Sequence, residues 1–342
     1  MKKTLTKIAF AASALLLGGA ASAEVVLKVH HFLGPKSPAH VSLISGWCND
    51  IAKASNNELK CQIFPAMQLG GTPPQLFDQA KDGTADVVWT LPGYTANRFS
   101  KTEVFELPFF VRDPSAASGA LYEYATKFAP DEFDGVKIIA LHTHGPGLIH
   151  TRDKQVTRLE DLQGMKLRGP TRLTNKMLGL MGATPIPMPV PGVPEAMNKG
   201  VIQGAILPYE VVPAIKLNEL AKFTAEPDPK GNALYTATFA FVMNPAKYNS
   251  LPAHLKKVID DHSGVAMSKR FGKLLHEGDT PGKKSMEQSN VTISVIPAAE
   301  VARWEQVTQK VAEDWVKEHE QRGVDGKKLI QEAKSLIEKH SK

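Results

Sequence analysis

The stretch 164–209 reads GMKLRGPTRLTNKMLGLMGATPIPMPVPGVPEAMNKGVIQGAILPY, and it decides our prediction of the fold. A short apolar strand ends at Arg168, because a Gly-Pro pair follows and stops it. Apolar residues then recur at helical spacing from Thr174 onward, with Thr171 or Thr174 available as the N-cap. This order places Arg168 at the carboxyl end of a strand beside a helix N-terminus, where open α/β sheets receive their ligands.

Arg168 has the chemistry of a carboxylate receptor. Its planar guanidinium matches a carboxylate through two hydrogen bonds and stays charged when it is desolvated. The residue alone leaves a second interpretation open, in which Arg168 pairs with a nearby Asp or Glu at the surface. Arg172, four residues later, is either a second cationic contact or a solvated helix residue.

Residues 1–23 contain the three parts of a secretory signal in order. Three lysines precede the apolar run Ile8–Leu17, and the small residues 21–23 form a cleavage site before Glu24. The apolar run is shorter than the roughly 20 residues that span a bilayer as a helix. We therefore predict a signal peptide over 1–23 and a periplasmic location for the mature chain.

The length and charge of the chain limit its class. A chain of 342 residues exceeds the usual single-core limit of about 250 to 300 residues, so two lobes are expected. The net charge of +6 includes the three lysines of the signal, which leaves +3 for the mature chain. This mild charge, without a basic stripe interleaved with aromatics, excludes nucleic acid as the expected partner.

The predicted elements indicate an α/β chain that crosses between its lobes several times. A strand at 25–32, a helix at 40–54 and a strand at 59–64 form a β-α-β opening, which predicts a parallel sheet. Repeated crossings make a hinge, and a cleft at a hinge can close over a ligand. We predict lobe I at 24–145 with 234–270 returning to it, lobe II at 146–233 with 271–300 returning to it, and a C-terminal helical segment at 301–342 packing across both.

The only two cysteines are Cys48 and Cys61. Counting the rise per residue along the predicted helix and the predicted strand places each cysteine roughly 10 Å from the turn between them. The two sulfur atoms can therefore lie side by side. In an oxidising compartment these positions favour a disulfide over two buried thiols. The C-x-x-C spacing of a redox-active pair is missing.

Aromatic and histidine side chains gather near predicted strand ends. Trp89 and Tyr94 follow a buried strand, where they belong either to the core or to a ligand site. His31 and His144 are expected to line such a site through hydrogen bonds. His142 and His144 are spaced like two ligands on one strand face, but no acidic or Cys partner stands nearby, so neither a metal nor a cofactor is predicted.

Three segments carry a family resemblance. They are QLGGTPPQLFDQAKDGTADVV (68–88), the run from Asp161 to Ala205, and FAFVMNPAKYNSLP (239–252). Within the second, L-x-G-x-K-x-R and G-A-x-P-x-P-M are the most specific motifs. The chain resembles the solute-binding proteins of tripartite ATP-independent periplasmic (TRAP) transporters, the DctP family, over nearly its whole mature length.

The resemblance implies a two-lobed periplasmic solute-binding fold with hinge-linked mixed sheets and a long C-terminal helix. It also implies a receptor that binds an organic acid and delivers it to membrane permease subunits. The carboxylate-binding arginine of the family falls on Arg168 by its position in the motif. A monomer is expected rather than a dimer.

One departure from the family pattern bears on the ligand. Members that bind sialic acids have a polar Asp-Gly-Gln-Glu-Asn-like run where this chain has Gln203-Gly204-Ala205-Ile206-Leu207. Burying sugar hydroxyls without partners would cost about 1–3 kcal/mol each, so an apolar or aromatic monocarboxylate, with or without a 2-keto or 2-hydroxy group, is favoured. A tyrosine hydroxyl is expected to replace the missing second anchor. The expected walls are Phe32, Trp89, Tyr94, Tyr209 and Phe239.

Other functions stay open at this point. The sequence contains no Gly-x-Ser-x-Gly elbow and no His-Glu-x-x-His motif, but a Ser-His-Asp set need not be adjacent in sequence. The alternatives are a secreted α/β enzyme acting on a carboxylate substrate, a receptor for C4-dicarboxylates or sugar acids, and a binding protein that signals through a membrane kinase.

Overall fold

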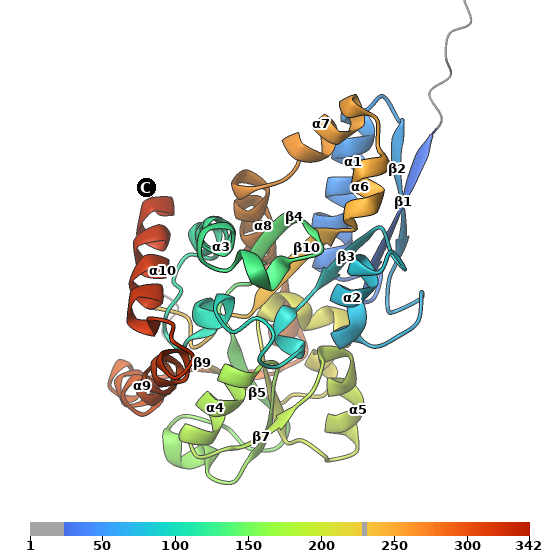
Figure 1. The fold of residues 1–342 in the computed structure, drawn as a ribbon. Coiled ribbons are helices and arrows are strands. Elements are labelled where there is room, and N and C mark those ends of the chain that lie inside the picture. The colour runs from blue at the N-terminus through green and yellow to red at the C-terminus, as the bar shows by residue number, and fades with distance from the viewer. Residues whose placement is uncertain (1–23, 228–230) are drawn as a thin grey trace, which may run out of the picture.

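The computed structural model describes residues 24–227 and 231–342 (Figure 1). The predicted signal peptide at 1–23 lies outside these residues. The strands are β1 (Val25–His31), β2 (Leu59–Phe64), β3 (Val87–Thr90), β4 (Lys137–Thr143), β5 (Leu148–Thr151), β6 (Lys166–Gly169), β7 (Thr184–Pro187), β8 (Gly204–Leu207), β9 (Phe223–Glu226), β10 (Thr238–Met243) and β11 (Thr292–Val295). The α-helices are α1 (Ser45–Ala54), α2 (Leu76–Lys81), α3 (Pro114–Phe128), α4 (Arg172–Leu180), α5 (Val193–Asn198), α6 (Pro245–Ser250), α7 (Ala253–Asp261), α8 (Val265–Gln288), α9 (Ala298–Glu320) and α10 (Gly326–His340).

The first sheet has the strand order β2-β1-β3-β10-β4. Strand β1 runs parallel to both β2 and β3, as the β-α-β opening predicts. Strand β10 lies antiparallel between β3 and β4, so the sheet is mixed. Its buried strands form near-continuous apolar runs, because helices cover both faces.

The second sheet has the order β11-β9-β5-β8-β6-β7. Strand β6 is parallel to β7 and β8, while β5 is antiparallel to β8 and β9. Arg168 is paired with Ala205 of β8 on one side and Ile186 of β7 on the other. The guanidinium therefore comes from an interior strand of this sheet, near its carboxyl end.

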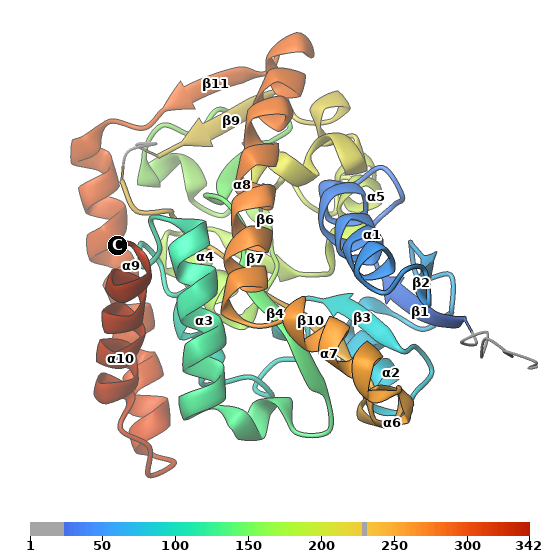
Figure 2. The ribbon, with the colours of Figure 1, turned by 90° about the horizontal axis from the view of Figure 1, so that it is seen from above.

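The chain passes between the two sheets more than once. Strand β10 joins the first sheet although it follows the strands β5 to β9 in sequence, and β11 then joins the second. Helix α8 contacts β4 of the first sheet, and Figure 2 shows it running from there toward β9 and β11. The two-lobed α/β class predicted from the sequence is confirmed, whereas the predicted residue boundaries of the lobes stay a prediction.

Two local predictions differ from the structure. The sequence pattern predicts a helix over 209–221, but this segment forms three separate 3-10 turns, because Pro213 and the left-handed Lys216 interrupt it. Conversely, the pattern predicts separate helices within 255–272 and 278–288, whereas α8 is one continuous helix of 24 residues. It retains Pro281 in its interior, and Gly278 does not end it.

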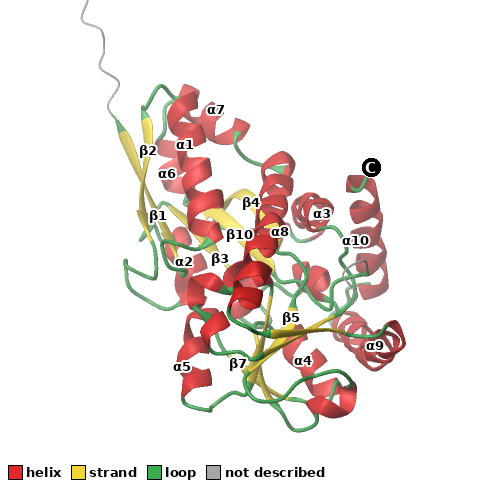
Figure 3. Cartoon of the chain, turned by 180° about the vertical axis from the view of Figure 1, so that it is seen from behind, coloured by secondary structure: helices red, strands yellow, loops and turns green. Residues whose placement is uncertain are grey.

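The C-terminal helices α9 and α10 lie against each other along one flank (Figure 3). Helix α9 contacts α4 beside the second sheet, and α10 contacts α3 beside the first. Trp304 and Trp315 of α9 are fully buried, and the Trp315 indole nitrogen donates to the carbonyl oxygen of Ser100 at 3.1 Å. These helices therefore connect elements from both sheets.

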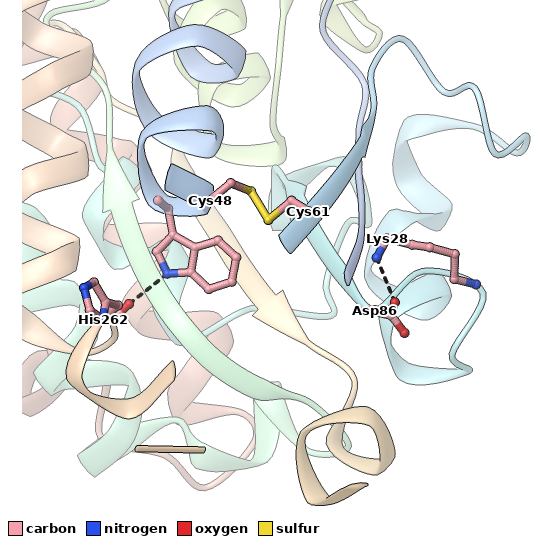
Figure 4. Close-up of a disulfide and its surroundings, with 6 residues drawn as sticks. Lys28, Cys48, Cys61, Asp86 and His262 are labelled. Atoms are coloured by element: carbon pink, nitrogen blue, oxygen red, sulfur yellow. Dashed lines mark hydrogen bonds between the residues drawn. A yellow bond between two sulfur atoms is a disulfide. The ribbon is translucent and has the colours of Figure 1, made fainter. Parts of the chain in front are cut away.

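The predicted disulfide is present. Cys48 of α1 is bonded to Cys61 of β2, with their Cα atoms 5.7 Å apart (Figure 4). The bond fastens α1 to the edge strand of the first sheet. Within the described part of the chain, no helix is long and apolar enough to cross a membrane.

Candidate functional site

Arg168 is buried, with only 1% of its surface exposed. Its Nε donates to the carbonyl oxygen of Met188 at 2.8 Å, and Nη1 donates to that of Ile206 at 3.3 Å. None of the ion pairs among the described residues includes Arg168. A surface pair with Asp or Glu is therefore not what holds this residue, and its buried positive charge has no carboxylate opposite it. Such a charge is costly until an anion compensates it.

A small cavity of about 30 Å³ lies in front of this guanidinium. Six predicted site residues line it together: Phe32, Trp89, Tyr94, His144, Arg168 and Phe239. The remaining lining residues are Leu33, Leu91, Pro170, Val190, Leu207, Pro208, Glu210, Val211, Tyr235 and Ala237.

Flat aromatic rings form one wall of the cavity. Trp89 stacks on Phe239 with ring centroids 4.7 Å apart and 9° between the planes, and on Phe32 at 4.9 Å. Tyr94 meets Phe32 edge-on at 5.5 Å. The indole nitrogen of Trp89 donates to Nε2 of His142 at 2.9 Å, which fixes the tilt of the ring. The first sheet thus presents a rigid apolar surface to the cavity.

The two histidines at the end of β4, His142 and His144, are neutral hydrogen-bonding residues. His142 Nε2 accepts from Trp89, and His144 Nε2 accepts from the backbone N–H of Ala237 at 3.0 Å. In each ring the other nitrogen is left to donate to a backbone carbonyl. Burial lowers the pKa of His142 to about 3 and that of His144 to about 4. Both ring nitrogens are occupied, so this pair has no free lone pair for a metal.

Tyr94 connects the two sides of the cavity. It lies in the 3-10 turn η3 (Pro92–Tyr94) after β3, and its hydroxyl accepts from the backbone N–H of Val190 at 3.0 Å. Val190 begins the turn η7 (Val190–Gly192), which follows β7 of the second sheet. Burial raises the pKa of Tyr94, and the nearby positive charge of Arg168 opposes that rise.

Sequence reasoning missed Tyr235. It is 1% exposed and lines the cavity, and its ring meets His144 edge-on at 5.4 Å. No hydrogen bond among the described residues involves its hydroxyl, while its carbonyl accepts from Gly147 at 3.0 Å. A Cβ at Gly147 would lie 1.9 Å from the Tyr235 ring, so glycine is required there. The sequence places Tyr235 at the start of a strand predicted over 235–243, but nothing in its pattern marks it as a site residue.

Two predicted lining residues lie elsewhere. His31 bonds through Nε2 to Nδ1 of His40 at 2.8 Å and touches Trp89 only edge-on at 6.4 Å, behind the aromatic wall. Tyr209 lines a second cavity together with Lys283, on the other side of the turn that follows β8. Tyr209 belongs to the 3-10 turn at 209–211, which packs against α8, the helix that carries Lys283.

Arg172 is neither a ligand contact at this cavity nor a solvated residue. At the first position of α4 it forms ion pairs with Glu103 and Glu318. Glu103 belongs to the turn η4 (Thr102–Glu106) beside the first sheet, and Glu318 to α9. Arg172 therefore connects three elements around the site. Among the described residues, no group of three His, Cys, Asp or Glu side chains is placed to hold a metal ion.

Two sheets of α/β structure and a cavity with an uncompensated guanidinium are the features of a solute-binding fold. Over residues 29–319 the sequence matches the family of bacterial extracellular solute-binding proteins, family 7, named DctP. The chain belongs to this family, whose members are the receptors of TRAP transporters.

Solved relatives share the fold over almost the whole chain. A TRAP solute-binding protein from Rhodoferax ferrireducens T118, in complex with copurified benzoate, is 47% identical with a TM-score of 0.92 over 93% of this chain and 98% of that chain. A marine metagenome TRAP solute-binding protein, specific for aromatic acid ligands and in complex with 3-hydroxybenzoate, is 42% identical with a TM-score of 0.91 over 94% and 100%. An uncharacterized protein of Haemophilus influenzae is 26% identical over 62% of this chain and 65% of its own length.

Proposed function

We propose that this protein is the periplasmic receptor of a TRAP transporter and that its ligand is an aromatic monocarboxylate. The observation that carries the proposal is the buried, unpaired guanidinium of Arg168 at one end of a cavity with aromatic walls. A carboxylate there would supply the missing counter-charge through paired hydrogen bonds. The aromatic ring of the ligand would then lie against the wall formed by Trp89 and Phe239.

Tyr235 is our candidate for the second anchor of the carboxylate. Its hydroxyl has no partner among the described residues, and the charge of Arg168 lies close enough to oppose the strong rise in the Tyr235 pKa that burial causes. A neutral phenol donates one hydrogen bond, which complements a carboxylate oxygen that Arg168 does not bind. This assigns the role to a different tyrosine from those named as walls in the sequence.

The apolar lining argues against sugar acids. Leu207 and Val211 present hydrocarbon to the cavity, and Ile206 uses its carbonyl oxygen to accept from Arg168. Each hydroxyl of a sugar acid buried here without a partner would cost about 1–3 kcal/mol. The relatives from Rhodoferax and the marine metagenome, which hold benzoate and 3-hydroxybenzoate, support an aromatic acid for this chain.

The same proposal covers the partner proteins and the absence of an enzymatic reaction. We expect delivery of the unchanged acid to the TRAP permease subunits, a monomeric receptor, and no enzymatic turnover. The buried histidines of the cavity support this, because both are neutral and fully hydrogen-bonded, which leaves neither as a free general base.

The test is calorimetric titration of the mature protein, from Glu24 onward, with benzoate, succinate and galactonate. We expect tight binding of benzoate alone, loss of that binding in Arg168→Ala, and full recovery of unchanged benzoate after denaturation. Arg270→Ala is the matched control, because Arg270 is a surface arginine paired with Asp50. Binding of succinate or galactonate but not benzoate would refute the aromatic ligand, and unaltered benzoate binding in Arg168→Ala would refute the anchor.

A further inference from the structure

Glu210 is an acidic side chain in the same cavity that the carboxylate site does not use. It lies in the turn η8 (Tyr209–Val211) directly after β8, lines the cavity, and is 5% exposed. Its Oε2 atom is buried without a partner, and no hydrogen bond or ion pair among residues 24–227 and 231–342 involves its carboxyl group. An unpartnered buried carboxyl group on a residue that lines a ligand cavity requires an explanation.

The surroundings of Glu210 disfavour the charged form of its carboxyl group. Burial, and then the negative charge of Asp279 on α8, raise its pKa well above the ordinary value. Arg168 lines the same cavity but forms no ion pair with Glu210. The Asp279 carboxylate accepts from the Glu210 backbone N–H at 3.0 Å and bonds to Nδ1 of His276 at 3.0 Å. It therefore forms no hydrogen bond with the Glu210 carboxyl group.

Packing fixes the position of Glu210. A Cβ at Gly278 would lie 3.0 Å from the Glu210 Cβ, and one at Gly282 would lie 2.1 Å from the Tyr209 carbonyl oxygen. Helix α8 therefore approaches the turn η8 closely: glycine is needed at position 282, and a side chain at position 278 would be tightly packed against Glu210. A side chain attached to so constrained a turn is preorganised, which is what discrimination between similar ligands requires.

We propose that Glu210 recognises a hydroxyl group on the ring of the aromatic acid whose carboxylate binds Arg168. This rests on the proposed function and names a narrower ligand class, the hydroxylated aromatic acids. A neutral carboxyl group offers one O–H donor and an acceptor oxygen, and a phenolic hydroxyl offers the complementary pair. An unsubstituted ring leaves the Glu210 group unpaired, so the site discriminates against it.

The experiment measures dissociation constants for benzoate and for its 2-, 3- and 4-hydroxy derivatives, and the readout is the ratio between them. For wild type we expect at least one hydroxybenzoate to bind about tenfold more tightly than benzoate. Glu210→Met removes the polar group at similar size, and its ratio should fall toward one. Glu210→Gln keeps a donor and an acceptor and should retain part of the preference. Glu195→Met is the control, because Glu195 is an exposed residue of α5.

An infrared difference spectrum of the wild type and Glu210→Gln gives a second readout that does not require Glu210→Met to fold. The carbonyl stretch of the protonated carboxyl group should shift when a hydroxybenzoate binds and not when benzoate binds, and this signal should be missing in Glu210→Gln. The inference is overturned if benzoate binds but no hydroxybenzoate is preferred, or if the carbonyl signal does not respond. If neither benzoate nor any hydroxybenzoate binds, the proposed function itself fails.

Discussion

Replacing Tyr94 with Phe removes one hydroxyl that joins the two sides of the cavity. That hydroxyl accepts the backbone N–H of Val190 at 3.0 Å, and Val190 is 5% exposed. When the lobes separate, water can satisfy this N–H, whereas in the closed form of Tyr94→Phe it is buried without an acceptor. An unsatisfied buried donor costs about 1–3 kcal/mol. We therefore expect a Kd for the aromatic acid about 5- to 150-fold weaker than that of wild type.

Calorimetric titration of wild type and Tyr94→Phe with the same acid measures this change. Tyr248→Phe is the matched control, because the Tyr248 hydroxyl bonds to the surface carboxylate of Asp260, away from the cavity residues. Its Kd should equal that of wild type. A Kd for Tyr94→Phe within twofold of wild type would show that this hydrogen bond does not favour closure, and the reasoning would be refuted. Folding of each variant is checked by its melting temperature without ligand.

Two further predictions concern stability. Cys48→Ser with Cys61→Ser opens a short loop, for which a disulfide contributes about 3 kcal/mol, so the melting temperature should fall by several degrees while the Kd is unchanged; a lowered affinity would contradict a purely structural role. Burial raises the pKa of Glu106 from 4.5 to about 7 in the folded protein, so the folded form binds more protons than the unfolded one between these values. Its contribution to stability therefore decreases as pH rises from about 4.5 to 7, and denaturant unfolding of Glu106→Gln should show a flatter pH dependence than wild type; identical slopes would exclude this carboxyl group as the cause.

The sequence predicted the elements whose signal is local. The strands β1 and β2, the helix between them, and the N-cap Thr171 follow from apolar periodicity and capping residues, and the structure has them close to the expected positions. The disulfide followed from counting residues along one helix and one strand. Arg168 was identified because a strand end, a turn signal and a helix start coincide around it.

What the sequence did not show depends on contacts across the fold. Tyr235 and Glu210 line the cavity only because β10 returns to the first sheet and because α8 packs on the turn after β8. Arg172 forms ion pairs with carboxylates of η4 and α9, which are distant from it in the sequence. Periodicity carries no information on such pairs, so a single sequence left Arg172 ambiguous and named Tyr209, but not Tyr235, as a wall of the cavity.

The arrangement of the site links binding to closure. The guanidinium of Arg168 comes from β6 of the second sheet, while the aromatic wall, including Trp89 and Phe239, comes from β3 and β10 of the first. A ligand that uses its carboxylate for one and its ring for the other contacts both lobes at once, so it stabilises the closed arrangement by its differential affinity for it. An acid without an aromatic ring would compensate Arg168 but gain little from the wall. Under the proposed function, charge would explain why an anion enters the cavity, and the wall would explain why an aromatic one holds the lobes together.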